Sequence, residues 1–149
     1  MKVATKAYGT VEVDECQRLT FASGLFGFEP LKEYVLLDAE RQPFYWLQSV
    51  DVQGAAFILI DPFLFRPDYE LDINDADALK AIGVSRPEEA LIFSIVTIPA
   101  SGPMTANLQG PLIINRDVRA GFQAILTDPR WGTKHNIMEE LAALREHSC

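Results

Sequence analysis

The sequence predicts a mainly β fold, a small antiparallel β-barrel-like domain with one or two short helices. Short runs rich in β-branched and aromatic residues recur along the chain, and such runs are typical of strands. Gly, Pro, Asn and Asp separate the runs, as turn-forming residues do. The 149 residues suit one domain, covering 1–149, because single domains commonly contain about 100–150 residues. Closure into a barrel would remove the exposed strand edges that a sheet of this size otherwise has to protect.

Eight segments have the composition of strands. The first alternates around a break at Tyr8 and Gly9, with Val11 and Val13 on one face. In order, the segments are Lys2–Val13, Gln17–Phe21, Tyr34–Leu37, Phe44–Val50, Ala55–Ile60, Leu91–Ile98, Leu112–Ile114 and Phe122–Leu126. The fifth and sixth are nearly continuous apolar runs, so we expect them to be buried on both faces.

Two segments have the signals of helices. Asn74 can cap a helix over Asp75–Ile82, and Gly83 follows its last turn, where glycine commonly ends a helix. Asn136 can cap a second helix over Ile137–Arg145. Apolar residues at i, i+4 and i+7 give this second helix one buried stripe.

The net charge of −8 argues against direct binding to nucleic acid, which requires a basic face, and against anionic membrane surfaces. Much of this charge lies between Asp61 and Glu89, which holds eight acids and three bases. Cys16 and Cys149 are interpreted as free thiols in a reducing compartment. The N-terminus lacks an apolar leader, and no apolar run approaches the ~20 residues of a membrane helix. We therefore expect a cytoplasmic protein.

The residues do not predict a catalytic, cofactor or metal site. His135 and His147 lie twelve residues apart, which is not the i, i+4 spacing of a helical zinc pair. Cys-x-x-Cys, nucleophile-elbow and phosphate-loop motifs are missing from the sequence. Asp72, Asp75 and Asp77 are explained more simply by a helix start and a solvated face than by a carboxylate pair. We expect a protein that is not an enzyme.

Two segments are candidates for a partner-binding surface. The first is 61–69, where Phe63 and Phe65 lie between two prolines and Tyr69 follows the second. This segment could equally be a core plug or an interface, since exposed apolar loops mark interfaces. The second is the loop with Met104, Thr105, Asn107 and Leu108. Thr and Asn form local turns, so a structural turn is favoured there and a partner surface is the alternative.

Two further segments have a structural interpretation that we favour over partner contact. The glycine-containing run Ser23–Pro30 predicts a tight turn that places Phe28 in the core. In the strand that begins at Phe44, the side chains of Phe44, Trp46 and Gln48 share one face. A buried Gln48 would need a hydrogen-bond partner.

A collinear set of short motifs resembles the FliW family along nearly the whole chain. The motifs are Gly24-Leu25-x-Gly27-Phe28-Glu29, Trp46-Leu47-Gln48-Ser49, Ala56-Phe57, Asp61-Pro62, Pro67-Asp68-Tyr69, Met104-Thr105-Ala106-Asn107-Leu108-x-x-Pro111-x-x-Ile114-Asn115 and Gln123-x-Ile125-Leu126. The block that begins at Met104 is the most specific part. Phe26 is a departure, because the family usually has proline at that position of the turn.

The resemblance implies a small β-barrel-like fold and a flagellar assembly factor that works by binding proteins. FliW-like proteins bind flagellin, at its C-terminal helical region. They also bind the translational repressor CsrA, and this binding relieves repression of the flagellin message. We expect the chain to act as a monomer, with Phe63, Phe65, Tyr69, Met104, Thr105, Asn107 and Leu108 as partner-binding residues. The alternative is a barrel that binds a small ligand or lipid in its interior, which a large apolar pocket would favour.

Overall fold

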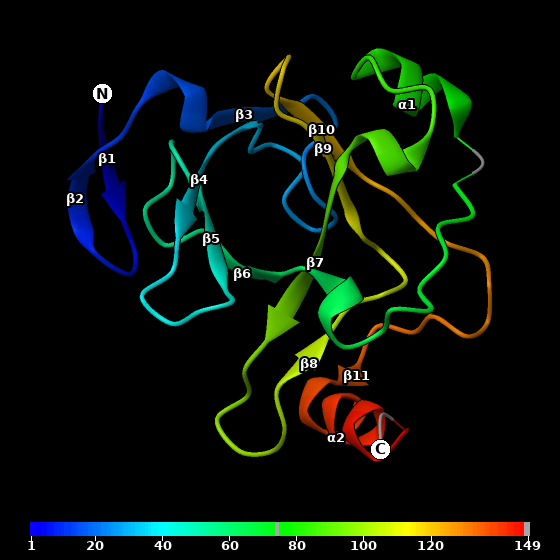
Figure 1. Ribbon diagram of the computed structural model, residues 1–149. Helices are drawn as coiled ribbons and strands as arrows, with labels where there is room; N and C mark the ends of the chain where they lie inside the picture. Colours follow the sequence, from blue (N-terminus) through cyan, green and yellow to red (C-terminus); the bar gives the residue numbers. More distant parts are fainter. Residues whose placement is uncertain (74, 148–149) are drawn as a thin grey trace.

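The structure is a computed structural model that describes residues 1–73 and 75–147. A closed barrel of seven strands forms its centre (Figure 1). Around the ring these strands are β3 (Arg18–Phe21), β4 (Glu33–Asp38), β5 (Tyr45–Ser49), β6 (Ala56–Ile60), β7 (Leu91–Thr97), β9 (Leu112–Asn115) and β10 (Ala120–Gln123). Pairing of β7 with β9 and of β10 with β3 closes the ring, which confirms the predicted barrel.

One pairing of the barrel departs from the antiparallel arrangement that the sequence predicts. Strand β10 runs parallel to β3, with Ala120 opposite Thr20 and Gly121 opposite Phe21. The other six pairings are antiparallel. Strand direction cannot alternate all the way around a ring with an odd number of strands, so at least one neighbouring pair must be parallel.

Alternate residues of each barrel strand point into the interior, as the two-residue period of a strand requires. These inward side chains form one tightly buried cluster. Its buried members are Leu19, Phe21, Leu25, Tyr34, Leu47, Leu59, Phe93, Leu112 and Ile114. None is more than 6% exposed, so side chains fill the barrel interior.

The outward-facing residues of the barrel form two further clusters, each covered by other parts of the chain. The hairpin of β1 (Lys2–Thr5) and β2 (Gly9–Glu12) lies on one side (Figure 1) and covers Val35 and Leu37. Gln48 fastens this hairpin, because its side chain accepts a hydrogen bond from the Lys6 N–H at 2.8 Å. Gln48 is only 1% exposed and also donates to backbone carbonyls, which confirms the expected need for partners.

The second outer cluster is the larger one, and it is covered by the 61–90 segment, the 104–108 loop and the C-terminal segment. Three short elements within this cover are η2 (Pro62–Leu64), α1 (Ala76–Ala81) and η3 (Pro87–Glu89). The Asp75 carboxylate caps α1 by accepting from the Ala78 N–H at 3.0 Å. The predicted cap, Asn74, lies outside the described residues.

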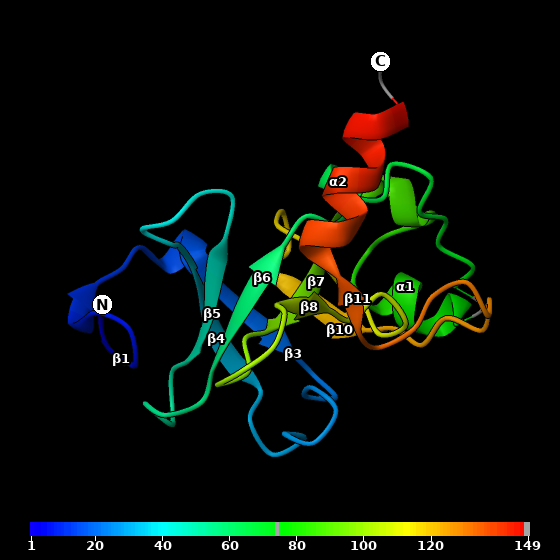
Figure 2. The same cartoon turned by 90° about the horizontal axis from the view of Figure 1, so that it is seen from below.

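Helix α2 (Ile137–His147) follows the short strand β11 (His135–Asn136). The Asn136 side chain accepts from the Glu139 N–H at 3.0 Å, which confirms the predicted cap. Ile137 is 1% exposed and anchors the first turn, while Met138 is 61% exposed. Figure 2 shows the helix projecting away from the barrel. Among the described residues, no helix is both long and apolar enough to cross a membrane.

Several predicted boundaries need correction. The last of the predicted strands corresponds to β10, which spans Ala120–Gln123 rather than Phe122–Leu126, because the backbone beyond it bonds to the 109–111 loop instead of to a strand. Gln17 belongs to η1 (Glu15–Gln17). Strands β11 and β8 (Thr105–Ala106) were not predicted from the sequence. Both of these have only two residues, which is too short for a periodic pattern to register.

The turn at Ser23–Pro30 is tight, but the prediction about Phe28 is wrong. Gly24 has a φ of +68°, and a Cβ there would lie 2.6 Å from the Glu29 backbone, so glycine is required. Leu25 enters the core at 1% exposure, whereas Phe28 is 41% exposed. Phe28 instead meets Phe57 edge-on, with ring centroids 5.0 Å apart.

Candidate functional site

The 61–69 segment presents an apolar ridge at the short helix η2. Asp61 caps this turn, since its carboxylate accepts a hydrogen bond from the Phe63 N–H at 2.9 Å. Pro62 occupies the first helical position, where its fixed φ suits a helix start. Phe63 is 39% exposed and Leu64 is 47% exposed. The local sequence thus holds two large apolar side chains toward solvent.

Carboxylates lie beside Phe63 in this ridge. Two adjoining surface hollows, of about 450 and 260 Å³, share Phe63 as a wall. Asp61, Glu70 and Glu88 line them, and neither hollow is lined by a described Lys or Arg. We call the set of Asp61, Phe63, Leu64, Glu70 and Glu88 the Phe63 surface. An apolar centre with a negative rim suits a partner that has an apolar patch and basic neighbours.

A second group, centred on the buried Trp131, packs against the same segment. Trp131 is 2% exposed, and the Tyr69 ring meets it edge-on at 4.8 Å between centroids. The guanidinium carbons of Arg66 and Arg130 each lie 4.8 Å from the Trp131 ring centroid, within the range of cation–π attraction. We call Arg66, Tyr69, Leu108, Arg130 and Trp131 the Trp131 cluster.

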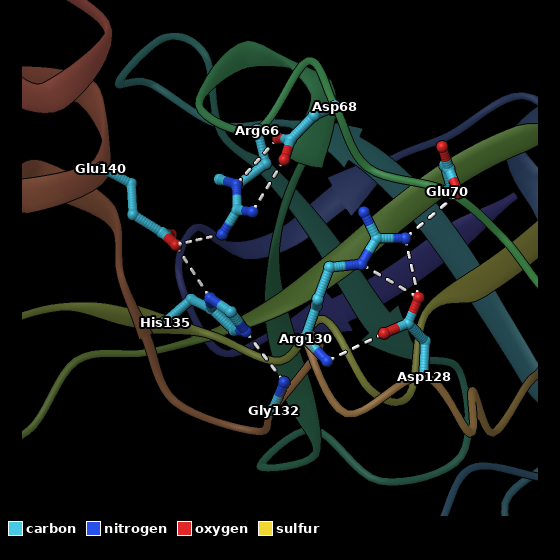
Figure 3. Close-up of polar contacts among 8 residues, drawn as sticks. All are labelled: Arg66, Asp68, Glu70, Asp128, Arg130, Gly132, His135 and Glu140. Atoms are coloured by element: carbon cyan, nitrogen blue, oxygen red, sulfur yellow. Dashed lines mark hydrogen bonds and ion pairs between the residues drawn. The ribbon is translucent and has the colours of Figure 1, made fainter.

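Ion pairs tie this cluster to α2 (Figure 3). Arg66 bonds to Asp68 at 2.9 Å and to Glu140 at 2.8 Å. Glu140 also lies 2.9 Å from the Nδ1 of His135. The Gly132 N–H donates to the Nε2 of the same ring at 2.8 Å, so Nε2 is the acceptor and the ring proton is on Nδ1, facing Glu140. His135 therefore links the backbone at Gly132 to Glu140 of α2.

A parallel set of bonds holds Arg130, which lies 2.7 Å from Asp128 and 3.1 Å from Glu70. The hydrogen bond from Arg130 holds the pKa of Asp128 below its usual value. In the same way, the hydrogen bond from Arg66 lowers the pKa of Asp68. Both carboxylates are thus stabilised as anions at neutral pH.

The 104–108 loop joins the Trp131 cluster through backbone bonds. The Tyr69 hydroxyl donates to the Leu108 carbonyl, and the Leu108 N–H donates to the Gly132 carbonyl at 3.0 Å. Asn107 accepts from the backbone N–H groups of Gln109 and Gly110. These bonds match the hydrogen-bonded turn favoured for this loop.

The candidate residues separate by exposure. Phe65 and Leu108 are 0% exposed and Tyr69 is 4% exposed, so these three side chains are buried in this structure. Met104, Thr105 and Asn107 are half-buried. Phe63 alone among the seven is exposed. A contact between any of them and a partner stays a prediction.

Sequence reasoning missed Trp131 and the arginines that stack on it. The adjacency of Arg130 and Trp131 was the one signal available, but Arg66 is far away along the chain. Within residues 1–73 and 75–147, no group of three or more His, Cys, Asp or Glu could hold a metal ion. Cys16 is exposed and free, while Cys149 lies outside the described residues.

Comparison with known proteins places this chain. A family model described as FliW protein matches residues 2–137. The chain belongs to the FliW family. The match spans the whole barrel, the Phe63 surface and all of the Trp131 cluster, and it ends at the first residue of α2. The resemblance found in the motifs is confirmed.

The relatives cover almost the full length of the chain. A flagellar assembly factor FliW of Treponema denticola is 54% identical over 144 residues, covering 96% of this chain and 97% of that protein. One of Treponema pallidum is 47% identical over 146 residues, covering 97% of each. A crystal structure of a flagellar assembly factor FliW superposes with a TM-score of 0.82 at 37% identity, covering 92% of this chain and 96% of that one. The FliW fold therefore extends to this sequence.

Proposed function

We propose that this chain is a flagellar assembly factor that binds flagellin, at its C-terminal helical region, and the translational repressor CsrA. By occupying CsrA it would relieve repression of flagellin mRNA translation, acting as a monomer in the cytoplasm. Full-length relatives named as flagellar assembly factors support the role in assembly. The Phe63 surface is the observation that carries the protein-binding part.

The chemistry of the Phe63 surface suits a basic protein partner. A repressor that binds RNA must present a basic face to the phosphates. Asp61 and Glu88, together with Glu70, which also pairs with Arg130, place carboxylates in the hollows beside Phe63, so the charges of the two proteins would attract and speed association. Burial of the two exposed apolar side chains would then supply affinity at the centre of the contact.

The alternative, a small ligand or lipid inside the barrel, has less support. Nine buried side chains fill the interior, and a ligand would have to displace them. The hydroxyl of Tyr34 has no hydrogen-bond partner there within the described part of the chain, but a single unpaired oxygen does not make room for a ligand. The surface hollows are better candidates for recognition than the interior.

The decisive experiment compares two phenylalanines of equal exposure. Phe63 and Phe28 are 39% and 41% exposed, but of the two only Phe63 lines the hollows that hold Asp61, Glu70 and Glu88. Affinities of Phe63→Ala and Phe28→Ala for purified flagellin and for CsrA would be measured by calorimetry. We expect Phe63→Ala to lose about tenfold or more for at least one partner, as a central anchor does, and Phe28→Ala to stay near wild type.

Salt dependence tests the acidic rim separately. If the carboxylates steer association, the on-rate for CsrA should fall as ionic strength rises, and Glu88→Gln should flatten that dependence. Wild-type affinity of Phe63→Ala for both partners would contradict the placement of the site. Failure of the wild-type protein to bind either partner would contradict the proposed function itself.

A further inference from the structure

A groove on the α1 side of the barrel is separate from the Phe63 surface. Its volume is about 680 Å³, and it runs between the turn that carries Phe26 and the segment that follows β10. Phe26, Ile73, Asp75, Phe122, Ile125 and Thr127 are among its lining residues. It shares none of them with the two hollows beside Phe63.

One wall of this groove is an extended backbone with hydrogen bonds on one side only. The Ala124 N–H donates to the Pro111 carbonyl at 2.9 Å, and the Leu126 N–H donates to the Gln109 carbonyl at 2.8 Å. The backbone groups of Ile125 and Thr127, which alternate with these, bond to no described residue. Among residues 1–73 and 75–147, the 124–127 segment therefore has a free edge.

The parallel closure of the barrel explains this free edge. Strand β3 pairs with β10 only at Ala120 and Gly121, and the chain then leaves β3 for the glycine turn. Beyond Gly121 the edge of the extended segment has no neighbouring strand, although its other side stays bonded to the 109–111 loop. A strand edge with unpaired donors and acceptors two residues apart is a template for another strand.

The side chains along the edge indicate what such a strand would carry. Phe26 is 52% exposed and Ile125 is 62% exposed, so apolar side chains at alternate positions would gain burial. Asp75 is the one ionisable side chain among the groove's described lining residues. Asp72 adds a second carboxylate beside the groove, bonded to the Thr127 hydroxyl at 2.8 Å, and a basic residue would match this pair.

We propose that this groove binds an extended segment of a protein partner, which adds as a strand along Ile125 and Thr127. Its alternate apolar residues lie against Phe26 and Ile125, and a Lys or Arg lies near Asp75. A second copy of this chain is a poor occupant, because two-fold pairing along the same edge would bring the acidic groups of both copies together, in a chain with a net charge of −8. The proposal does not depend on the proposed function, since it uses a different surface.

The first test uses the full chain and a defined probe. The probe is a fluorescent seven-residue peptide of alternating Val and Thr between terminal lysines, and the control is the same peptide with N-methylated alternate amides. We expect the parent peptide to bind, to protect the Ile125 and Thr127 amides from hydrogen exchange, and to bind about tenfold or more tightly than the methylated one. Equal binding of the two peptides, or no binding of the parent peptide at millimolar concentration, would overturn the proposal.

Two substitutions locate the site. Ile125→Pro removes a donor that is not used within the fold, so the protein should stay folded and lose about tenfold in affinity for the peptide, while Ile125→Val should bind as wild type. Asp75→Asn keeps a cap for α1 and should weaken the lysine peptide about threefold without affecting a glutamine-ended version. Undiminished binding by a folded Ile125→Pro variant would overturn the proposal.

A last measurement distinguishes a partner segment from a second copy of this chain as the occupant of the groove. Light scattering of the protein alone should give a size that is independent of concentration. Concentration-dependent dimers that Ile125→Pro abolishes would show that the edge serves self-association, which would also overturn the proposal.

Discussion

The Phe63 surface and the Trp131 cluster both draw on the 61–70 segment and touch where the Phe63 and Tyr69 rings meet, with centroids 5.7 Å apart, yet their aromatic side chains differ sharply in exposure. Phe63 is 39% exposed, while Phe65, two residues later, is fully buried. The reason is the 3-10 turn at η2, which has about three residues per turn, so that positions two apart point in different directions. The aromatic content of a loop thus says little about which of its rings a partner can touch.

The two regions also differ in what holds them. The Phe63 surface depends on one capped turn, whereas the Trp131 cluster joins the 61–70 segment, the 104–108 loop and α2 by stacking and hydrogen bonds. Substitutions in the cluster should therefore act on stability, and substitutions on the surface should act on binding.

The largest effect is expected from Trp131→Ala. Loss of a buried indole, together with its contacts to Tyr69 and two arginines, should lower the free energy of unfolding by about 3–5 kcal/mol. Urea denaturation would measure it. Met138→Ala is the control, since Met138 is 61% exposed and its loss should cost less than about 0.5 kcal/mol. A Trp131→Ala protein as stable as the control would remove the distinction between the two regions.

Tyr69→Phe should have the next largest effect. It leaves the Leu108 carbonyl without the hydroxyl that bonds to it, and an unpaired buried carbonyl costs about 1–3 kcal/mol. The same denaturation assay applies. Tyr34→Phe is the matched control: the Tyr34 hydroxyl has no partner within the described residues, so its removal should leave stability unchanged or raise it. Equal losses in the two variants would mean that the Tyr69 bond contributes nothing.

Phe63→Ala should cost only about 1 kcal/mol of stability, because the ring is partly solvated and burial contributes in proportion to area. The loss of partner affinity, by contrast, should be large. Denaturation and calorimetry on the same preparation would give both numbers. A variant that is strongly destabilised would move Phe63 from the surface into the supporting cluster.

The smallest effect is on pH dependence. Because Arg66 holds the pKa of Asp68 below its usual value, the pair stabilises the fold above about pH 4, the unfolded pKa of Asp. That contribution is lost as pH falls through the lower folded pKa. Asp68 is 57% exposed, so the loss should be only about 0.2–1 kcal/mol. Thermal unfolding from pH 5 to pH 2 should show a shallower decline for Asp68→Asn, and identical profiles would show that the pair contributes nothing.

Local patterns predicted most of the fold. The break at Tyr8 and Gly9 within Lys2–Val13, most of the strand runs and the Asn136 cap all depend on residues near one another in sequence, and the structure confirms them. The prediction for Ile98 was wrong: it is 60% exposed, just beyond the end of β7. An apolar run predicts that a strand is present, but it does not say where the neighbouring strand stops covering it.

The candidate site was less predictable for a related reason. The sequence singles out the segments at 61–69 and 104–108 as candidates, but their exposed and buried members could not be told apart. Arg66 and Glu140 are 74 residues apart in the chain and bond at 2.8 Å. Tyr69 and Leu108, which also bond, are 39 residues apart. No periodicity within one segment encodes such pairs.

The sequence by itself determined most of the barrel strands, because these depend on the composition and alternation of neighbouring residues, and it determined the family, because the motifs that identify it occur in order along the chain. Only the tertiary structure decided that one pair of strands is parallel, that Phe63 faces solvent while Phe65 does not, and that Ile125 lies on a free edge. These features depend on where the ring closes and which distant segments meet. Local strand and turn propensities restrict the possible arrangements, but contacts between distant segments decide which arrangement forms.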